Sequence, residues 1–179
     1  MTDIEDPAYD DARHVWNGLI DRSPTLIIRP TGTADVVEAV NFAREHHLLL
    51  SVRGGGHNVA GNAVNDDGVV IDLSSMRGVF VEPARRTARV QGGATWGDVD
   101  RETQVHGLAT TGGQVSTTGV AGLTLHGGLG VLHRKYGLTI ETSSPWRSSL
   151  PMARSGPRAR PNTPICFGRS GARAVTLAS

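Results

Sequence analysis

Cysteine is almost absent from this chain of 179 residues, in which Cys166 is the single thiol. One thiol excludes an internal disulfide framework and a metal cluster held by several thiolates. Long apolar runs are also missing, since none approaches the roughly 20 residues that cross a bilayer. The N-terminus, "MTDIEDPAYDDARHVWNG", is acidic and lacks the basic region and apolar core of a secretory leader. We therefore expect a cytoplasmic location and no membrane partner.

Acidic residues are absent after Glu141, and all 17 of them lie at or before that position. Six arginines follow it, so the body of the chain sets 12 basic against 17 acidic residues, a net charge of −5. A body of this sign is not that of a nucleic-acid-binding protein. The segment 143–179 is rich in Pro, Arg and Ser and has no sustained periodicity, so its composition predicts disorder.

Two stretches of the body have helical patterns. Residues 33–47 repeat apolar side chains at helical spacing, and Thr33 can cap this helix. Residues 95–107 begin with Thr95 as a cap and end on Gly107, which is typical of a helix terminus. Both segments are therefore expected to be helices of ordinary length.

Strand patterns occur in two clusters. Short apolar runs at 48–52 and 69–73 predict buried strands, and residues 79–93 alternate around a Pro-containing turn as a hairpin does. The clusters separate near Arg77, which favours an α+β fold of two small subdomains with two glycine-rich loops facing each other across them. The expected divisions are an N-terminal segment at 1–24, a domain at 25–142 and a tail at 143–179.

Glycine is in excess, with 23 residues in 179 against a usual share of about 7%. "RGGGHN", residues 53–58, is the first glycine loop. Successive glycines let several backbone N–H groups point into one concavity that binds phosphate oxygens, and Arg53 can add charge at its edge. The loop is neither a Walker loop nor a dinucleotide fingerprint. A tight turn holding a surface histidine is the alternative interpretation.

"GGQVSTTGVAGLTLHGG", residues 112–128, is the second Gly/Thr segment. Its glycines remove side chains along one backbone track, while its serine and threonines supply uncharged hydroxyl donors. A backbone laid against a flat or extended ligand needs this composition. The alternative is a Gly-rich segment that packs between the subdomains.

Taken together, the motifs carry a resemblance. "RGGGHNVAGNAV" with "GVVIDLSSMRGV", "ARVQGGATWGDVD" and "GLATTGGQVSTTGVAGLTLHGGLGVLHRKYGLTIE" occur in this order. They resemble the PCMH-type FAD-binding domain of the vanillyl-alcohol oxidase superfamily, closest to the berberine-bridge-enzyme-like FAD-linked oxidases. The resemblance runs from about Pro30 to Glu141. It implies two small α/β subdomains that cradle FAD.

The resemblance also implies which residues contact FAD. His57 is the position that bonds covalently to the 8α-methyl of the flavin ring, and a neutral imidazole nitrogen is a suitable nucleophile. Val115 stands where some members carry a cysteine that makes a second link, so no second link is expected. His126 stands where the family often has glycine. The implied cofactor-binding residues are Arg53, Gly54, Gly55, Gly56, His57, Asn58, Gly61, Gly112, Gly113, Val115, Ser116, Thr117, Thr118, Gly119, Gly122, Gly127 and Gly128.

The implied activity is that of a flavin-dependent oxidoreductase, in which flavin N5 accepts hydride from a small-molecule C–H and oxygen reoxidises the flavin. No catalytic residue is assigned within this chain. The remaining histidines pair with no carboxylate at a metal-ligand spacing, so no metal site is expected. The substrate is not specified by these residues.

The tail departs from the family's pattern. "PNTPICFGRSGARAVTLAS" can be encoded by GC-rich codons whose reading two bases later gives "EHPDLFWAIRGAGGNFGV", which resembles the motif expected there. We hypothesise a shift of reading frame near Thr142, which the encoding nucleotide sequence would decide. The domain would then be incomplete at its C-terminus and inactive alone, leaving an oxidase domain without its substrate cover. A non-catalytic FAD-binding fragment, or a remnant without function, is the alternative.

Overall fold

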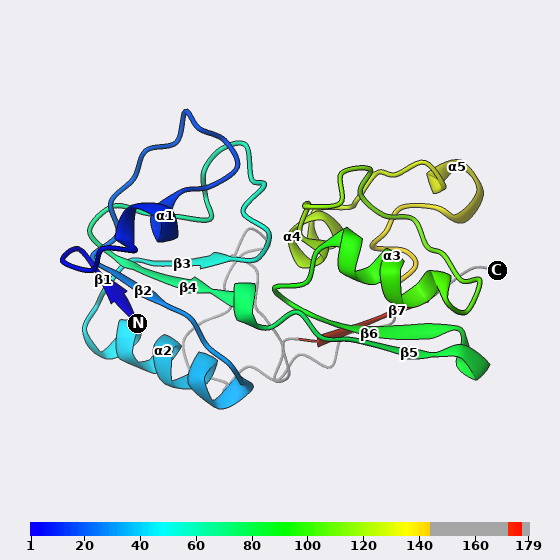
Figure 1. Ribbon diagram of the computed structural model, residues 1–179, viewed down its shortest axis with the longest axis horizontal. Coiled ribbons are helices and arrows are strands. Elements are labelled where there is room, and N and C mark those ends of the chain that lie inside the picture. Colours follow the sequence, from blue (N-terminus) through cyan, green and yellow to red (C-terminus); the bar gives the residue numbers. More distant parts are fainter. Residues whose placement is uncertain (144–171, 177–179) are drawn as a thin grey trace, which may run out of the picture.

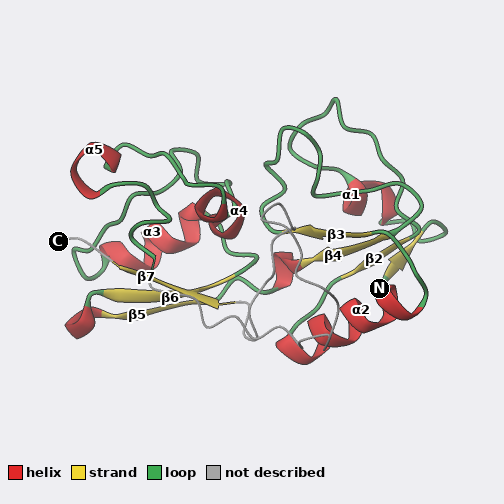
Figure 2. Cartoon of the chain, turned by 180° about the vertical axis from the view of Figure 1, so that it is seen from behind, coloured by secondary structure: helices red, strands yellow, loops and turns green. Residues whose placement is uncertain are grey.

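Two separate β-sheets, each with its own helices, divide the chain into a first and a second lobe (Figure 1). The computed structural model describes residues 1–143 and 172–176. Helices and strands are mixed along the chain, and Figure 2 shows the same two lobes from behind, so the predicted α+β class is confirmed. The predicted separation of the strand clusters near Arg77 is also confirmed, because Arg77 lies between the last strand of the first sheet and the first strand of the second.

The first sheet has the strand order β1-β2-β4-β3. Strand β4 (Val69–Asp72) is central, and β2 (Leu26–Ile28) and β3 (Leu50–Arg53) run parallel to it on either side. The short β1 (Thr2–Asp3) pairs antiparallel with β2 at the edge. All four residues of β4 are buried, as expected for a parallel strand covered on both faces.

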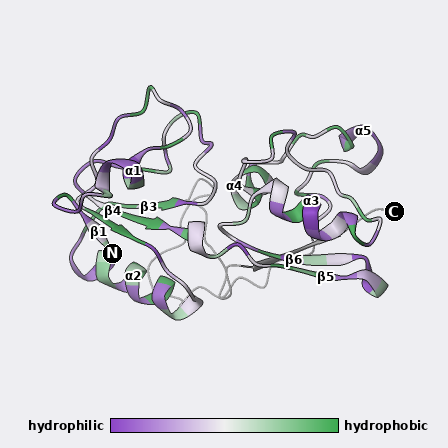
Figure 3. Ribbon diagram, in the orientation of Figure 1, coloured by the Kyte–Doolittle hydropathy of each residue, from purple (hydrophilic) through white to green (hydrophobic). Residues whose placement is uncertain are grey.

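Two helices cover the two faces of this sheet, α1 (Tyr9–Arg13) on one and α2 (Thr33–Glu45) on the other (Figure 1). Alternate residues of β4 serve the two sides. Val70 packs with residues of α1, whereas Ile71 packs with Ala39 of α2. The hydropathy colouring of Figure 3 shows the apolar residues concentrated in these strands.

The start of α2 differs from the prediction. Thr33 is the first helical residue rather than the cap, and Gly32 occupies the N-cap position. The carboxylate of Asp35 accepts hydrogen bonds from the backbone N–H groups of Thr31 and Gly32, at 2.8 and 3.1 Å. A side chain from the first turn of the helix therefore binds the backbone N–H groups just before it, including that of the N-cap Gly32. Strand β3 likewise begins two residues later than predicted and ends on Arg53.

The second sheet is antiparallel, with the order β5-β6-β7. The predicted hairpin is confirmed as β5 (Val79–Glu82), a 3₁₀ turn at Pro83–Arg85 and β6 (Thr87–Gln91). A second 3₁₀ turn, Leu73–Ser75, follows β4 at the junction with the first lobe.

Helix α3 (Trp96–Gln104) packs on the second sheet through buried Trp96 and Val99. Its cap is Thr95, as predicted, and Asp98 accepts from the Thr95 backbone N–H at 2.8 Å. Two short helices within and after the second Gly/Thr segment, α4 (Val120–Leu125) and α5 (His133–Tyr136), complete the lobe.

Strand β7 (Ala172–Thr176) belongs to the predicted tail and pairs antiparallel with β6. The expectation of disorder is therefore not met at these five residues. The rest of the tail, at 144–171 and 177–179, lies outside the described residues, as does most of the segment to which the reading-frame hypothesis applies.

Over the described ranges 1–143 and 172–176, every helix is too short or too polar to cross a bilayer. The same ranges hold no group of three or more His, Cys, Asp or Glu side chains arranged to bind a metal ion.

Candidate functional site

The two glycine-rich regions meet backbone against backbone where the lobes join. A Cβ placed on Gly55 would lie 2.6 Å from the Cα of Gly119, and a Cβ on Gly119 would lie 2.9 Å from the Cα of Gly55. No side chain fits between them, so both positions require glycine. The prediction that the two loops face each other is confirmed by this contact.

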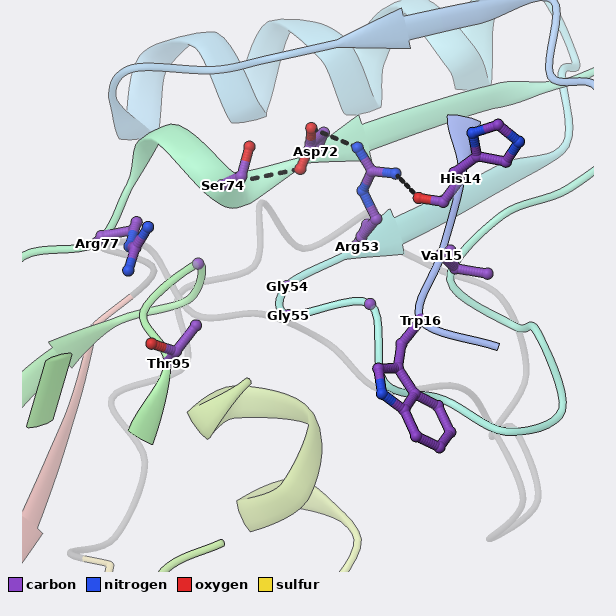
Figure 4. Close-up of a pocket in the computed structure, with 12 residues that line it drawn as sticks. His14, Val15, Trp16, Arg53, Gly54, Gly55, Asp72, Ser74, Arg77 and Thr95 are labelled. Atoms are coloured by element: carbon purple, nitrogen blue, oxygen red, sulfur yellow. Dashed lines mark hydrogen bonds and ion pairs between the residues drawn. The ribbon is translucent and has the colours of Figure 1, made fainter. Parts of the chain in front are cut away.

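The first glycine loop follows β3 and therefore lies at the carboxyl ends of the parallel strands β2, β3 and β4. This is the edge of an open α/β sheet at which ligands bind. A cavity of about 250 Å³ opens there (Figure 4). Backbone of the loop lines one side, and polar side chains from the first turn after β4 and from the start of α3 line another. The lining residues are His14, Val15, Trp16, Arg53, Gly54, Gly55, Gly56, Asp72, Ser74, Arg77, Gly93 and Thr95.

The sequence suggests that Arg53 adds charge at the edge of the loop, and in the structure Arg53 lines the cavity with this charge paired. Its side chain is buried, and its Nη2 donates to Oδ2 of Asp72 at 2.6 Å. Its Nη1 donates to the carbonyl of His14 at 3.0 Å (Figure 4). Arg53 and Asp72 are cross-strand neighbours at the ends of β3 and β4. The guanidinium therefore anchors the loop to the sheet and to the N-terminal segment.

Asp72 receives further donors. Arg29 Nε donates to the same Oδ2 at 3.1 Å, and the backbone N–H of Ser74 donates to Oδ1 at 3.1 Å. Burial of Asp72 acts to raise its pKa, but the hydrogen bonds and charge of Arg53, with those from Ser74 and Arg29, outweigh burial and hold the pKa below its usual value. The carboxylate is thus ionised at neutral pH and ties three strand ends together.

His57 joins the two glycine-rich regions. Its Nε2 lies 2.9 Å from Oγ1 of Thr117, a residue 60 positions later in the chain. The indole of Trp16 stacks on its ring with centroids 5.0 Å apart and planes 18° apart. Partial burial lowers the pKa of His57, so its imidazole is neutral at neutral pH. A neutral ring nitrogen is the form that acts as a nucleophile.

Several other predicted residues lie away from the cavity and serve packing. A Cβ on Gly112 or Gly113 would lie 2.5 or 2.7 Å from ring atoms of Trp96. A Cβ on Gly128 would lie 2.6 Å from the Cβ of Thr139. The alternative interpretation of the second Gly/Thr segment, as a packing segment, therefore holds at these three positions.

The remaining predicted residues fall into two groups. Gly61 and Gly127 have positive φ angles of 75° and 101°, which favour glycine whatever lies nearby. The other group is open to solvent: a Cβ at Gly122 would meet nothing within 4 Å, and Val115 is 54% exposed. Asn58, Ser116 and Thr117 are exposed, and Thr118 is partly exposed. These positions leave room for a ligand along the surface of the segment.

Sequence reasoning missed part of the cavity. Gly93 is required because a Cβ there would collide with the carbonyl of Leu73, and its signal was the glycine pair in "QGGAT". Ser74 and Arg77 follow the buried β4 run at the carboxyl edge, a place where side chains can be anticipated to meet a ligand. Trp16 carried no signal in the sequence pattern.

His126 stands where a glycine was expected and fits without crowding. It is exposed at the C-cap of α4, where its Nδ1 lies 2.7 Å from the carbonyl of Gly122. The imidazole therefore serves the end of the helix.

Comparison with known proteins gives consistent matches. A sequence profile of the FAD binding domain matches residues 24–147. (R)-6-hydroxynicotine oxidase of Paenarthrobacter nicotinovorans is 40% identical over 137 residues, which cover 76% of this chain and 30% of that protein. Berberine bridge enzyme-like D-1 of Nicotiana tabacum is 41% identical over 126 residues, which cover 66% of this chain and 22% of that protein. The chain thus spans less than a third of the length of either relative.

A solved structure extends the match to the fold. The crystal structure of 6-hydroxy-D-nicotine oxidase from Arthrobacter nicotinovorans superposes with a TM-score of 0.83 at 31% sequence identity. The superposition covers 98% of this chain and 41% of that one. The fold is therefore shared.

Proposed function

Because the chain belongs to the FAD-binding domain family of FAD-linked oxidoreductases, the PCMH-type group that includes the berberine-bridge-enzyme-like proteins, we propose that it binds FAD where its two lobes meet. The observation that carries this proposal is the glycine-on-glycine contact of Gly55 and Gly119 beside the 250 Å³ cavity. The contact brings the lobes together without side chains, and the bare backbone of Gly54–Gly56 beside it lines the cavity and offers N–H donors to phosphate oxygens.

The residues present fit part of the cofactor. Backbone of Gly54–Gly56 and the hydroxyl of Ser74 line the cavity and supply neutral donors for a pyrophosphate, whereas the Thr95 hydroxyl donates to Asp98. Arg77 lines the same space with a half-exposed side chain, although Asp98 binds it through two hydrogen bonds of 2.9 and 2.7 Å. The cavity is too small for the whole dinucleotide. The exposed surface of residues 114–118 and Gly122 provides the continuation.

His57 is proposed as the covalent tether. A ring nitrogen takes the place of one hydrogen on the 8α-methyl of the flavin, so a C–N bond forms while a C–H and an N–H bond break. The two hydrogens and their electrons pass to molecular oxygen as hydrogen peroxide. The contact with Thr117 and the neutral state of the ring support this role. Val115 offers no thiol, so a single link is proposed.

The bound flavin supplies hydride acceptance from a small-molecule C–H, followed by transfer of electrons to oxygen. The chain's own residues hold the cofactor, exclude water from one face of His57 and keep the imidazole neutral. The activity, substrate and partners of the complete oxidoreductase are part of this proposal, since the chain spans less than a third of its curated relatives.

The test is to mix the purified chain with FAD, remove free cofactor, precipitate with acid and measure flavin fluorescence in the pellet and the supernatant. We expect stoichiometric flavin before acid and a pellet that keeps it. His57→Ala should move the flavin to the supernatant, whereas His46→Ala, at the end of α2 in the first lobe, should not. A chain that retains no flavin before acid would refute FAD binding, and acid-stable flavin in His57→Ala would refute the tether.

A further inference from the structure

Trp16 is an exposed aromatic residue with a defined partner. Its side chain is 63% exposed, yet its indole lies parallel to the imidazole of His57, with ring centroids 5.0 Å apart. A large apolar side chain left this exposed gains little from burial alone. The stabilisation from Trp16 therefore comes from its stacking on His57, because aromatic pairs at this separation attract one another.

The backbone around Trp16 is bound to the first glycine loop. The N–H of Trp16 donates to the carbonyl of Gly56 at 3.2 Å, and Asn17 Nδ2 donates to the carbonyl of Val59 at 2.9 Å. On the other side of Trp16, the carbonyl of His14 accepts from Arg53. Residues 14–17 are thus held to the loop both before and after His57. The place of the indole is fixed by main-chain contacts rather than by the indole alone.

The imidazole of His57 is then constrained in two ways. The hydrogen bond to Thr117 holds Nε2, and the indole covers one face of the ring. Within residues 1–143 and 172–176, Nδ1 makes no hydrogen bond. Burial by these neighbours also lowers the pKa of His57. A nucleophile gains most when its orientation is fixed before the reaction, because a misplacement of about 1 Å can cost a factor of about 100 in rate.

We propose that Trp16 is a positioning residue for His57, and that its indole holds the imidazole in the orientation from which the flavin link forms. The inference rests on the proposed tether at His57. It assigns a role in cofactor attachment to the N-terminal segment 14–17, outside both glycine-rich regions.

The experiment compares three side chains at position 16 at saturating FAD. Flavin-free wild type, Trp16→Phe and Trp16→Leu are mixed with FAD, and acid-stable flavin is followed with time. Leucine keeps apolar bulk without an aromatic face, and phenylalanine restores a smaller face. We expect linkage in Trp16→Leu to slow by about 10-fold or more and Trp16→Phe to recover to within about 3-fold of wild type. Because Trp16 also lines the cavity, reversible FAD affinity is measured for each variant in a His57→Ala background, and the FAD concentration is set to saturate all three proteins.

Phe42→Leu is the matched control. Phe42 packs on His46 with ring centroids 4.6 Å apart, so the substitution removes the same kind of contact far from the glycine loops. Linkage should be unchanged in this variant. Equal linkage rates for Trp, Phe and Leu at position 16 would overturn the inference, as would a slowing in Phe42→Leu equal to that in Trp16→Leu.

A second measurement does not depend on linkage. In the wild type without flavin, the carbon-bound ring protons of His57 should show an upfield NMR shift from the indole ring current, which Trp16→Leu removes and Trp16→Phe keeps in part. Absence of this shift in the wild type would overturn the inference even if Trp16→Leu failed to fold. Acid-stable flavin missing from the wild type would refute the tether and the inference together. Normal linkage in Trp16→Leu would refute only the role of Trp16.

Discussion

The first glycine loop and the second Gly/Thr segment share a composition but differ in what lies against their glycines. Gly54–Gly56 line a cavity, and the atoms nearest Gly55 are backbone atoms of Gly119 and Thr117. Gly112, Gly113 and Gly128 instead lie against the protein's own side chains, Trp96 and Thr139. In the first loop, glycine leaves backbone open to a ligand and lets the two lobes touch. In the second segment, glycine makes room for side chains that pack against it.

Breaking the anchor of the first loop should have the largest effect on stability. Asp72→Asn leaves Arg53 and Arg29 buried or half-buried without their carboxylate, and removing one partner of a buried pair costs about 3–5 kcal/mol. Urea unfolding of wild type and variant measures the loss. Glu82→Gln is the control, because its pair with Arg85 is exposed and its loss should cost about 0–1 kcal/mol. A loss for Asp72→Asn no larger than that control contradicts the anchoring role.

The same pair predicts a dependence on pH. Because the folded-state pKa of Asp72 is lowered, its ionisation contributes stability that is fully present above the unfolded pKa of about 3.9 and is lost as the pH falls through the folded value. The difference in unfolding free energy between wild type and Asp72→Asn should thus be constant from pH 5 to 7 and shrink below about pH 4. If the difference in unfolding free energy grew as the pH falls, the pKa of Asp72 would not be lowered in the folded state, and its role as an ionised anchor would be refuted.

The contact between the lobes should be the next most sensitive point. Gly55→Ala places a Cβ against the backbone of Gly119, which cannot move like a side chain, so we expect a loss of about 3 kcal/mol, the upper part of the overpacking range, together with weakened FAD binding. Gly32→Ala, where a Cβ meets nothing within 4 Å, is a control of the same chemistry. For Gly55→Ala we expect a lower unfolding free energy in a denaturant titration and a weaker affinity in an FAD titration. An unchanged FAD affinity would show that the glycine contact is not part of the cofactor site.

The packing glycines should lose stability without losing the ligand. Gly112→Ala pushes a methyl group against the ring of Trp96, and overpacking of this kind costs about 1–3 kcal/mol. Since Gly112 does not line the cavity, FAD affinity of the folded fraction should stay within about 3-fold of wild type. A large loss of FAD affinity at unchanged stability would show that Gly112 contacts the ligand rather than serving packing.

Gly122→Ala should give the smallest effect and the sharpest comparison. Gly122 lies inside α4 with open space around it, so alanine should stabilise the chain by about 0.5–1 kcal/mol through helix propensity. We expect the added methyl to weaken FAD binding, because FAD is proposed to lie along this surface. Stability and affinity should therefore change in opposite directions. Unchanged affinity in an isothermal titration would show that the cofactor does not approach Gly122.

Local signals predicted most of the fold. The helix capped by Thr95, the buried run of β4 and the hairpin around Pro83 each depend on residues adjacent in sequence, and each lies where the pattern indicated. The N-cap of α2 is Gly32, one residue earlier than predicted, and the carboxylate of Asp35 binds the backbone N–H groups of Thr31 and Gly32. Such a contact between a helical side chain and the backbone before the helix is not visible in the apolar pattern.

The candidate site was harder to predict because its meaning depends on distant partners. The sequence places the charge of Arg53 at the edge of a phosphate loop but does not reveal its partners, which are Asp72, 19 residues later, and His14, 39 residues earlier. The glycines of the second segment looked alike until their neighbours were known. The stack of Trp16 on His57 joins residues with no shared motif, so only the three-dimensional arrangement reveals it.

The contact of Gly55 with Gly119 also limits how this junction can change by mutation. In most packed pairs, the steric clash caused by a larger residue can be removed by substituting its neighbour with a smaller one. Here both members are already the smallest residue, so neither can compensate for the other. A selection for second-site revertants of Gly55→Ala should therefore return changes that shift one whole lobe, such as substitutions near Thr95, and none at position 119.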